Sequence, residues 1–253
     1  MKIILRYIFL TAVRDWLFLG LLICLFFAFG LSAFISNAAL SEQLQMQLAL
    51  FGGTSRLIIS FGMILFICFH IHRSFETRET LYIMSKNISR YEFITAYWLG
   101  FNFITLLLLI PVFILMLFLK ANTFGLIEWS ISLWLELLII STFAIISSLI
   151  LKSAVSSVLG TSGFYLMSRL MGFFSANIAF SYENRFDKIF TNTSYFLMRI
   201  LSILFPRLDL FAQTKLLVYG SENSIFTTII IQSVIYILIM LCIAFYDFRK
   251  KEF

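Results

Sequence analysis

The chain has 253 residues, of which 61% are hydrophobic and 13% charged, and its mean hydropathy is +0.98. An ordinary soluble domain is about half apolar with about a quarter of its residues charged, so this composition excludes a water-soluble globular fold. The net charge of +6 would suggest nucleic acid as a partner of a soluble protein. In a membrane protein it first reports topology, and we expect no nucleic-acid partner.

The long apolar runs predict helices that cross a membrane. They lack the two-residue alternation of a transmembrane barrel. One crossing takes about 20 apolar residues, which leaves room for about six in this length. We therefore expect an all-α membrane protein with one transmembrane domain over residues 1–253 and six transmembrane helices in contact with membrane lipid.

The N-terminal third is expected to hold an interfacial helix and two spans. Residues 1–15 place apolar side chains on one helical face, which is typical of a helix in the headgroup plane, and the first span follows at 16–35. A polar connection with a turn at Gly52-Gly53 then leads to the second span at 57–72. This reading places Arg56 in a loop outside the membrane.

Residues 73–92 form the most polar stretch of the first half of the chain. Residues 74–85 have a helical pattern, and Ser89 with Glu92 has the spacing of a capping box before the third span at 97–119. A short charged helix is therefore predicted between the second and third spans.

The fourth and fifth spans, at 129–151 and 153–178, are expected to form a hairpin around Lys152. Residues 181–223 contain apolar clusters too short to cross, so they predict short external re-entrant or interfacial helices before the sixth span at 224–246. Threading six spans gathers more basic residues on the side of both termini, which indicates that this side is cytoplasmic. These residues are Lys2, Arg6, Arg14, Arg73, Arg78, Lys86, Arg90, Lys152, Arg249, Lys250 and Lys251.

Two charged residues, Glu136 and Arg169, fall inside predicted spans. Intramembrane charges are costly and indicate function by default. A helical rise of 1.5 Å puts Glu136 about 10 Å and Arg169 about 13 Å from the external ends of their spans. We expect them to form an ion pair or to line a route between subunits, while the alternative is that Glu136 snorkels outward and Arg169 only braces helices.

Several kinds of chemistry find no support in the sequence. No GxxxxGK[ST] phosphate loop occurs, so the chain is not expected to be an enzyme and any ATP hydrolysis would belong to a partner. His70 and His72 point to different faces at the end of a span and are predicted to be interfacial polar residues, with no metal site. Cys24, Cys68 and Cys242 are interpreted as packing residues. Phe173, Phe174 and Phe180 could face a lipid-like molecule, although aromatic residues at this spacing more often pack.

The charged stretch resembles the cytoplasmic coupling segment of type-2 ABC exporter permeases. The matching runs are Glu76-Thr-Arg-Glu-Thr-Leu81 and Met84-Ser-Lys-Asn-Ile-Ser-Arg90-Tyr-Glu92. Glu79 stands where that family usually has Gly, and Asn87 where it usually has Pro. The order of spans and Pro206-Arg-Leu208 before the last span are similar to the family as well.

The resemblance implies a permease subunit that forms the substrate path as a homodimer or heterodimer in the bacterial cytoplasmic (inner) membrane. A separate cytoplasmic ABC ATPase would bind ATP and Mg, and this chain would hold no cofactor. The resemblance places the ATPase contact at or beside Glu76, Arg78, Glu79, Thr80, Leu81, Ser89 and Arg90.

Two alternatives remain at this point. The first is a haem-exporter-like membrane subunit of cytochrome maturation, whose coupling pattern matches residues 76–90 less well. The second is a non-transport membrane scaffold that recruits a soluble protein through residues 73–92. The sequence does not name the transported substrate.

Overall fold

The computed structural model describes residues 7–11, 16–39, 42–77, 90–183, 201, 205–219 and 223–250. At positions 90, 175–183, 223–225 and 250 it describes the backbone alone. The described residues form helices, turns and bends, with no strand among them. The predicted all-α class is therefore confirmed.

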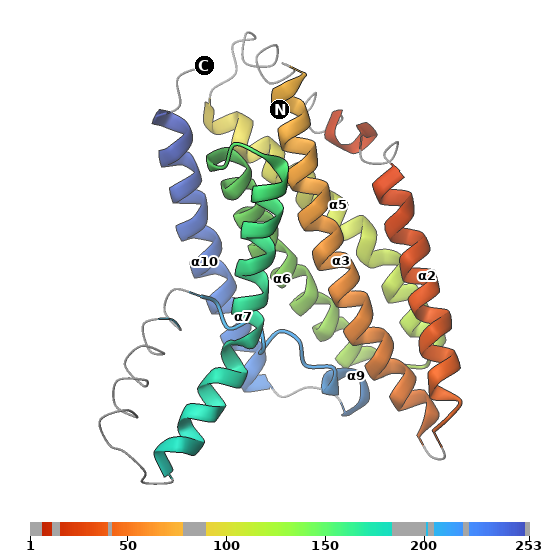
Figure 1. Ribbon diagram of the computed structural model, residues 1–253. Coiled ribbons are helices and arrows are strands. Elements are labelled where there is room, and N and C mark those ends of the chain that lie inside the picture. The colour runs from red at the N-terminus through yellow and green to blue at the C-terminus, as the bar shows by residue number, and fades with distance from the viewer. Residues whose placement is uncertain are drawn as a thin grey trace.

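Long helices make up most of the described chain and lie side by side in a bundle (Figure 1). They are α2 (Trp16–Ser36), α3 (Gln43–Glu76), α5 (Arg90–Phe118), α6 (Thr123–Ile150), α7 (Ala154–Glu183) and α10 (Asn223–Lys250), and a short α9 (Lys215–Tyr219) precedes the last. Among the described residues, five of the helices are long and apolar enough to cross a membrane, which makes this a membrane protein. The exception is α7, where serines, glycines and Arg169 dilute the apolar residues.

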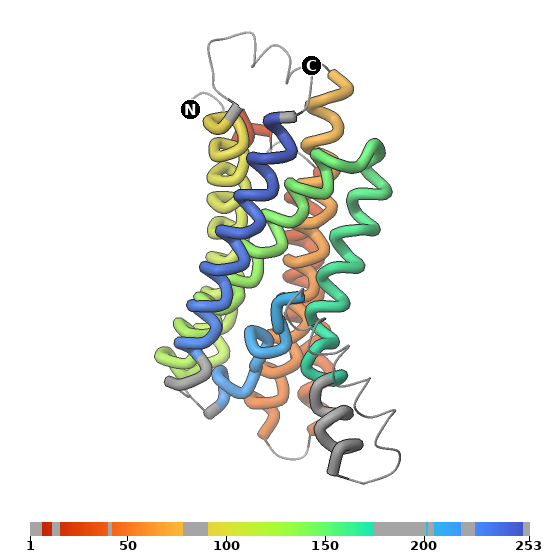
Figure 2. Tube along the Cα trace, turned by 90° about the vertical axis from the view of Figure 1, so that its left-hand side faces the viewer, coloured from red at the N-terminus to blue at the C-terminus, as the bar shows by residue number. Residues whose placement is uncertain are grey.

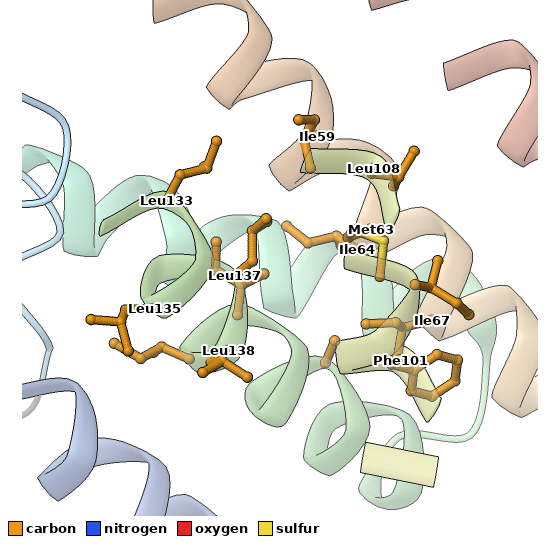
Figure 3. Close-up of a cluster of buried hydrophobic side chains, with 14 of the residues drawn as sticks. Ile59, Met63, Ile64, Ile67, Phe101, Leu108, Leu133, Leu135, Leu137 and Leu138 are labelled. Carbon is orange, nitrogen blue, oxygen red and sulfur yellow. The ribbon is translucent and has the colours of Figure 1, made fainter. Parts of the chain in front are cut away.

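Helix α6 lies at the centre of the bundle and contacts α3, α5, α7, α9 and α10. Leu133, Leu137 and Ile139 are fully buried on it. They belong to the same apolar core as Ile59 and Ile64 of α3 and residues of α5 (Figure 3). By contrast, α2 and α10 have few buried residues and lie at the periphery, where lipid would cover them.

Helix α3 differs from the prediction at its beginning. It runs without a break for 34 residues from Gln43 to Glu76, so the turn expected at Gly52-Gly53 is wrong. A helix tolerates these glycines at a modest cost, and Gly52 faces Leu217, whose Cδ1 would lie 2.8 Å from an added Cβ. Its close packing explains why the helix carries glycine there. The same continuity brings Arg56 inside the bundle.

The other ends of the helices also extend past the predicted spans. Helix α3 includes residues 74–76, which the sequence pattern assigned to a separate charged helix, and α5 begins at Arg90. Helix α6 begins at Thr123, where the Asn122 side chain accepts a hydrogen bond from the backbone N–H of Phe124 at 3.2 Å. This arrangement is an N-cap, and it adds more than a turn to the predicted fourth span.

Residues 7–11 are helical and lie at one end of the bundle, but they do not simply rest on a surface. Ile8 is fully buried, and its side chain packs against Gly100 of α5. The rest of the interfacial helix predicted at 1–15 lies outside the described residues. The packing prediction for the cysteines is right for the buried Cys68 and wrong for Cys24 and Cys242, which are exposed.

The helix ends sort onto two sides of the bundle. The end of α3 at Glu76, the beginning of α5, the α6–α7 turn and the end of α10 lie at one end, uppermost in Figures 1 and 2. The α2–α3 and α5–α6 connections lie at the opposite end, as does α9. The end of α3 at Glu76, the beginning of α5 at Arg90 and the C-terminal end of α10 thus share a side of the bundle.

Candidate functional site

Three charged side chains meet inside the bundle, each from a different helix. The Glu136 carboxylate of α6 accepts from Arg169 of α7, with Arg169 Nη1 2.9 Å from Glu136 Oε1. Its second oxygen, Oε2, lies 2.6 Å from Nη1 of Arg56 on α3. The ion pair expected between Glu136 and Arg169 is therefore present, and it is part of a triad.

Burial distinguishes the members of this triad. The side chains of Arg56 and Glu136 are both 0% exposed, whereas that of Arg169 is 22% exposed. A buried carboxylate or guanidinium is tolerated only when it is paired and hydrogen-bonded. The alternative in which Glu136 snorkels to the surface is wrong.

Arg56 is held by bonds from its two terminal nitrogens. Nη1 also donates to the backbone carbonyl of Phe211 at 2.6 Å, and Nη2 donates to Ser132 Oγ at 3.0 Å. The guanidinium carbon lies 5.0 Å from the centre of the Trp129 ring, within range of a cation–π contact. A planar fork of donors suits this arrangement, and a lysine could not reproduce it.

The triad lies near the middle of the bundle. Arg56 and Glu136 are each 13 residues from the beginnings of their helices, Gln43 and Thr123, and Arg169 is 14 residues from the end of α7 at Glu183. At 1.5 Å per residue, all three are about 20 Å from those helix ends. These distances exceed the roughly 10 and 13 Å predicted from the span ends, because the helices extend beyond the predicted spans.

A segment made of turns and the short helix α9 reaches the triad from one end of the bundle. Residues 205–219, pale blue in Figures 1 and 2, lie against the lower half of the long helices and include the turn that carries Phe211. Leu208 and Phe211 are fully buried. The segment therefore packs into the bundle, while the short external re-entrant or interfacial helices expected over 181–223 stay a prediction. Residues 184–200 and 202–204 lie outside the described residues.

Polar contacts hold this segment in place. The Leu208 N–H donates to the Ser168 carbonyl of α7 at 3.2 Å, and Arg207 Nη2 lies 3.0 Å from Asp209 Oδ2. The Asp209 side chain packs directly on Gly172, where a Cβ would collide with its carboxylate. Irregular backbone at membrane depth is tolerated only where protein surrounds it and satisfies its polar groups. The Arg56 bond to the Phe211 carbonyl does so here.

A second polar connection joins the same three helices nearer to the α6–α7 turn. Ser147 and Thr161 are hydrogen-bonded at 2.7 Å, and Thr161 Oγ1 lies 4.0 Å from Cys68 Sγ. His72 Nε2 lies 2.9 Å from Ser157 Oγ. His72 is buried, and so is His70 among aromatic rings of α3 and α5, so both face other helices of the bundle. Their predicted position at the membrane interface stays a prediction.

Two of the residues proposed for coupling are described, and both lie at one end of the bundle. Glu76 is exposed in the last turn of α3, and Arg90 begins α5. The others lie outside the described residues: Arg78, Glu79, Thr80, Leu81 and Ser89. The structure thus brings Glu136 and Arg169 together in one site and keeps Glu76 apart from them.

Sequence reasoning missed Arg56 and Phe211. The signal for Arg56 was present, because apolar residues continue on both sides of it from Leu48 to Leu65, but two adjacent glycines were taken as a turn. No pattern could have found Phe211, because it contributes its backbone carbonyl.

Comparisons with known proteins identify no relative for this arrangement. A scan against protein-family models finds no match, and a search of curated proteins finds none either. The chemistry of the residues and their geometry therefore carry the functional argument.

Proposed function

We propose that this chain is the membrane-spanning subunit of an ATP-driven transporter similar to the type-2 ABC exporters. In this proposal it works as a dimer in a bacterial inner membrane, with both termini in the cytoplasm, and a separate cytoplasmic ATPase binds ATP and Mg. The resemblance of residues 76–92 to a coupling segment supports the assignment. The ATPase would bind to that segment.

The observation that carries the proposal is the continuity of α3. One uninterrupted helix joins the exposed Glu76 at its end to the buried Arg56, 20 residues earlier, which is about 30 Å along the axis. Arg56 in turn binds α6 and the 205–219 segment, and Glu136 binds α7. A displacement of the end of α3 would therefore be transmitted to every element around the triad.

The proposal includes α7 as the fifth of six crossings. Its 30 residues would extend about 45 Å, more than the roughly 30 Å of a hydrocarbon core. It runs antiparallel to α6 after a turn at 151–153, as the paired contacts Glu136–Arg169 and Ser147–Thr161 require. The charge of Arg169 on this helix is paired with Glu136, and this ion pair lowers the cost of placing α7 in the membrane.

Transport then follows from a shift between two arrangements. ATP binding would favour one position of the coupling segment, and α3 would carry that bias to the triad. A ligand can shift such an equilibrium only by its differential affinity for the two states, so ATP must hold the ATPase pair differently in each. Packed helices respond by discrete shifts, and the path between subunits would open and close accordingly.

The test is co-purification from detergent with the ATPase, using Glu76→Lys and a matched control. The control is Glu42→Lys, an exposed acidic residue that precedes the first residue of the same helix at the opposite end of the bundle. We expect an ATPase to co-purify with the wild type and with Glu42→Lys. With Glu76→Lys, most or all of the co-purifying ATPase should be lost. A lysine at position 76 would repel the basic group of the partner that the wild-type glutamate attracts.

Three results would count against this proposal. If no ATPase accompanies the wild-type protein, the transporter proposal is wrong. If charge reversals at Glu76 and Arg90, made singly and together, retain as much ATPase as the control Glu42→Lys, the contact does not lie at this segment. Partner proteins without nucleotide hydrolysis would favour a scaffold.

A further inference from the structure

The buried triad carries more positive than negative charge. Two guanidinium groups share one carboxylate, and among the described residues Glu136 is the only acid that bonds to either arginine. An excess positive charge buried inside a helical bundle is unfavourable unless another anion approaches it. The two arginines differ in how accessible they are to such an anion.

Arg56 is enclosed and has no room for a ligand. Its side chain is fully buried, and both terminal nitrogens already bond to Glu136, Phe211, Ser132 or Trp129. Its surroundings fix it as the internal link of the triad. An anion that reached it would first have to displace the 205–219 segment.

Arg169 has an outward edge. Its Nη1 donates to Glu136 and, at 3.1 Å, to the Tyr165 hydroxyl. Within the described part of the chain Nη2 and Nε of Arg169 bond to nothing, and the side chain is 22% exposed. The inner half of the guanidinium is thus fixed by Glu136 and Tyr165, while the outer half offers donors to a molecule beside α7.

The surface around this edge is apolar. Leu166 and Phe173 stand three residues before and four after Arg169, so they lie on the same side of α7, and Phe173 is 64% exposed. Leu170 is exposed next to them. A ligand at this position would meet a cation flanked by aliphatic and aromatic side chains at about 20 Å from the helix end.

We propose that Arg169 is an anion-binding position for an amphiphilic molecule, one that carries a carboxylate or phosphate on an apolar chain. The guanidinium fork matches the oxygens of either group, and the Leu166–Phe173 strip matches the chain. The role of this position in transport rests on the proposed function. Binding itself does not, since it requires only the purified chain.

The experiment measures equilibrium binding of radiolabelled dodecyl phosphate to the full chain in phosphatidylcholine nanodiscs, without an ATPase. Dodecanoate and the uncharged 1-dodecanol serve as competitors, and empty nanodiscs give the background. The variants are Arg169→Gln, Arg169→Lys and Lys152→Gln. Lys152 is the matched control, because it is an exposed basic residue at the turn before α7 and removing it lowers the net charge equally.

We expect saturable binding that dodecanoate displaces and 1-dodecanol displaces at least about tenfold less well. A tenfold change corresponds to the loss of one charge-assisted hydrogen bond. Arg169→Gln should weaken binding about tenfold or more, Arg169→Lys less, and Lys152→Gln not at all. The lysine variant keeps the charge and also keeps the test meaningful if the glutamine variant does not fold.

Three outcomes would overturn the proposal. The first is equal displacement by the neutral alcohol, and the second is an equal loss of affinity in Lys152→Gln, which would show attraction to the basic surface in general. The third is a wild-type protein that forms a dimer and binds no dodecyl phosphate, together with an Arg169→Gln variant that is monomeric. In that case the anion paired with Arg169 would be a carboxylate of the second copy. An ATPase that fails to co-purify would count against the transporter and leave this site standing.

Discussion

At the level of single residues, Glu136 holds the buried site together. It is the shared partner of Arg56 and Arg169, so its removal leaves two guanidinium groups without a counter-charge. Removing Arg169 has a smaller effect, because Glu136 keeps its bond to the fully buried Arg56. The consequences of the three substitutions should therefore be unequal.

We predict that Glu136→Gln destabilises the protein most, by about 3–5 kcal/mol, as expected when a buried ion pair loses one partner. Arg56→Gln should have a similar effect, and Arg169→Gln should cost about 1–3 kcal/mol, the range for one hydrogen bond to a charged group. Thermal unfolding in detergent, followed by tryptophan fluorescence, measures the order. Arg207→Gln is the control, because its pair with Asp209 is partly exposed and worth at most about 1 kcal/mol.

The double variant Glu136→Gln/Arg169→Gln separates a triad from a simple pair. If Glu136 and Arg169 formed an isolated pair, removing both charges would restore much of the stability. Because Arg56 stays charged, we expect the double variant to remain nearly as unstable as Glu136→Gln. Full recovery would contradict the assignment of Arg56 to the site.

At the level of elements, segment 205–219 packs closely against α7. Gly172 leaves room for the Asp209 side chain, whereas Gly163, two to three turns earlier on the same helix, has nothing within 4 Å of an added Cβ. The two glycines therefore form a matched pair. An alanine gains similar intrinsic helix propensity at both positions, about 1 kcal/mol, and clashes at only one.

We predict that Gly172→Ala loosens the segment, while Gly163→Ala leaves it in place or stabilises the protein by up to about 1 kcal/mol. The clash pushes Asp209 away from α7, which weakens the adjoining bond from Leu208 N–H to Ser168. Limited trypsin digestion after Lys215, together with thermal unfolding, measures this. Equal digestion of the two variants would show that the segment is not anchored at Gly172.

The elements also show how far the sequence could be read. Hydropathy found every long helix, and every helix end except the beginning of α3 to within about two turns, because apolar runs of this length have no other stable form in lipid. The beginning of α3 was misread because paired glycines are ambiguous between a turn and a tightly packed helix, and the packing partner Leu217 is 165 residues away. Glu136 and Arg169 were identified because a charge in a span stands out. The third member was hidden by the misplaced turn.

At the level of the whole molecule, the number of crossings decides whether the end of α3 at Glu76 and the C-terminal end of α10 share a side of the membrane with the α6–α7 turn. Among the described residues five helices are apolar enough to cross, and the proposed function makes α7 the sixth crossing. If α7 crosses, Ser153 before it and Gln213 after it lie on opposite sides. Asn37, between α2 and α3, should lie on the same side as Gln213.

We predict this pattern for single-cysteine variants labelled in intact cells with a membrane-impermeant maleimide, after Cys24, Cys68 and Cys242 are replaced by alanine. Asn37→Cys and Gln213→Cys should react, and Ser153→Cys should react only after permeabilisation, since basic residues on its side mark the cytoplasm. Labelling of Ser153→Cys and Gln213→Cys from the same side would mean that α7 does not cross. The exposed edge of the Arg169 guanidinium would then be solvated by water and not by lipid. Its ion pair with Glu136 would suffice to balance its charge, without a second anion.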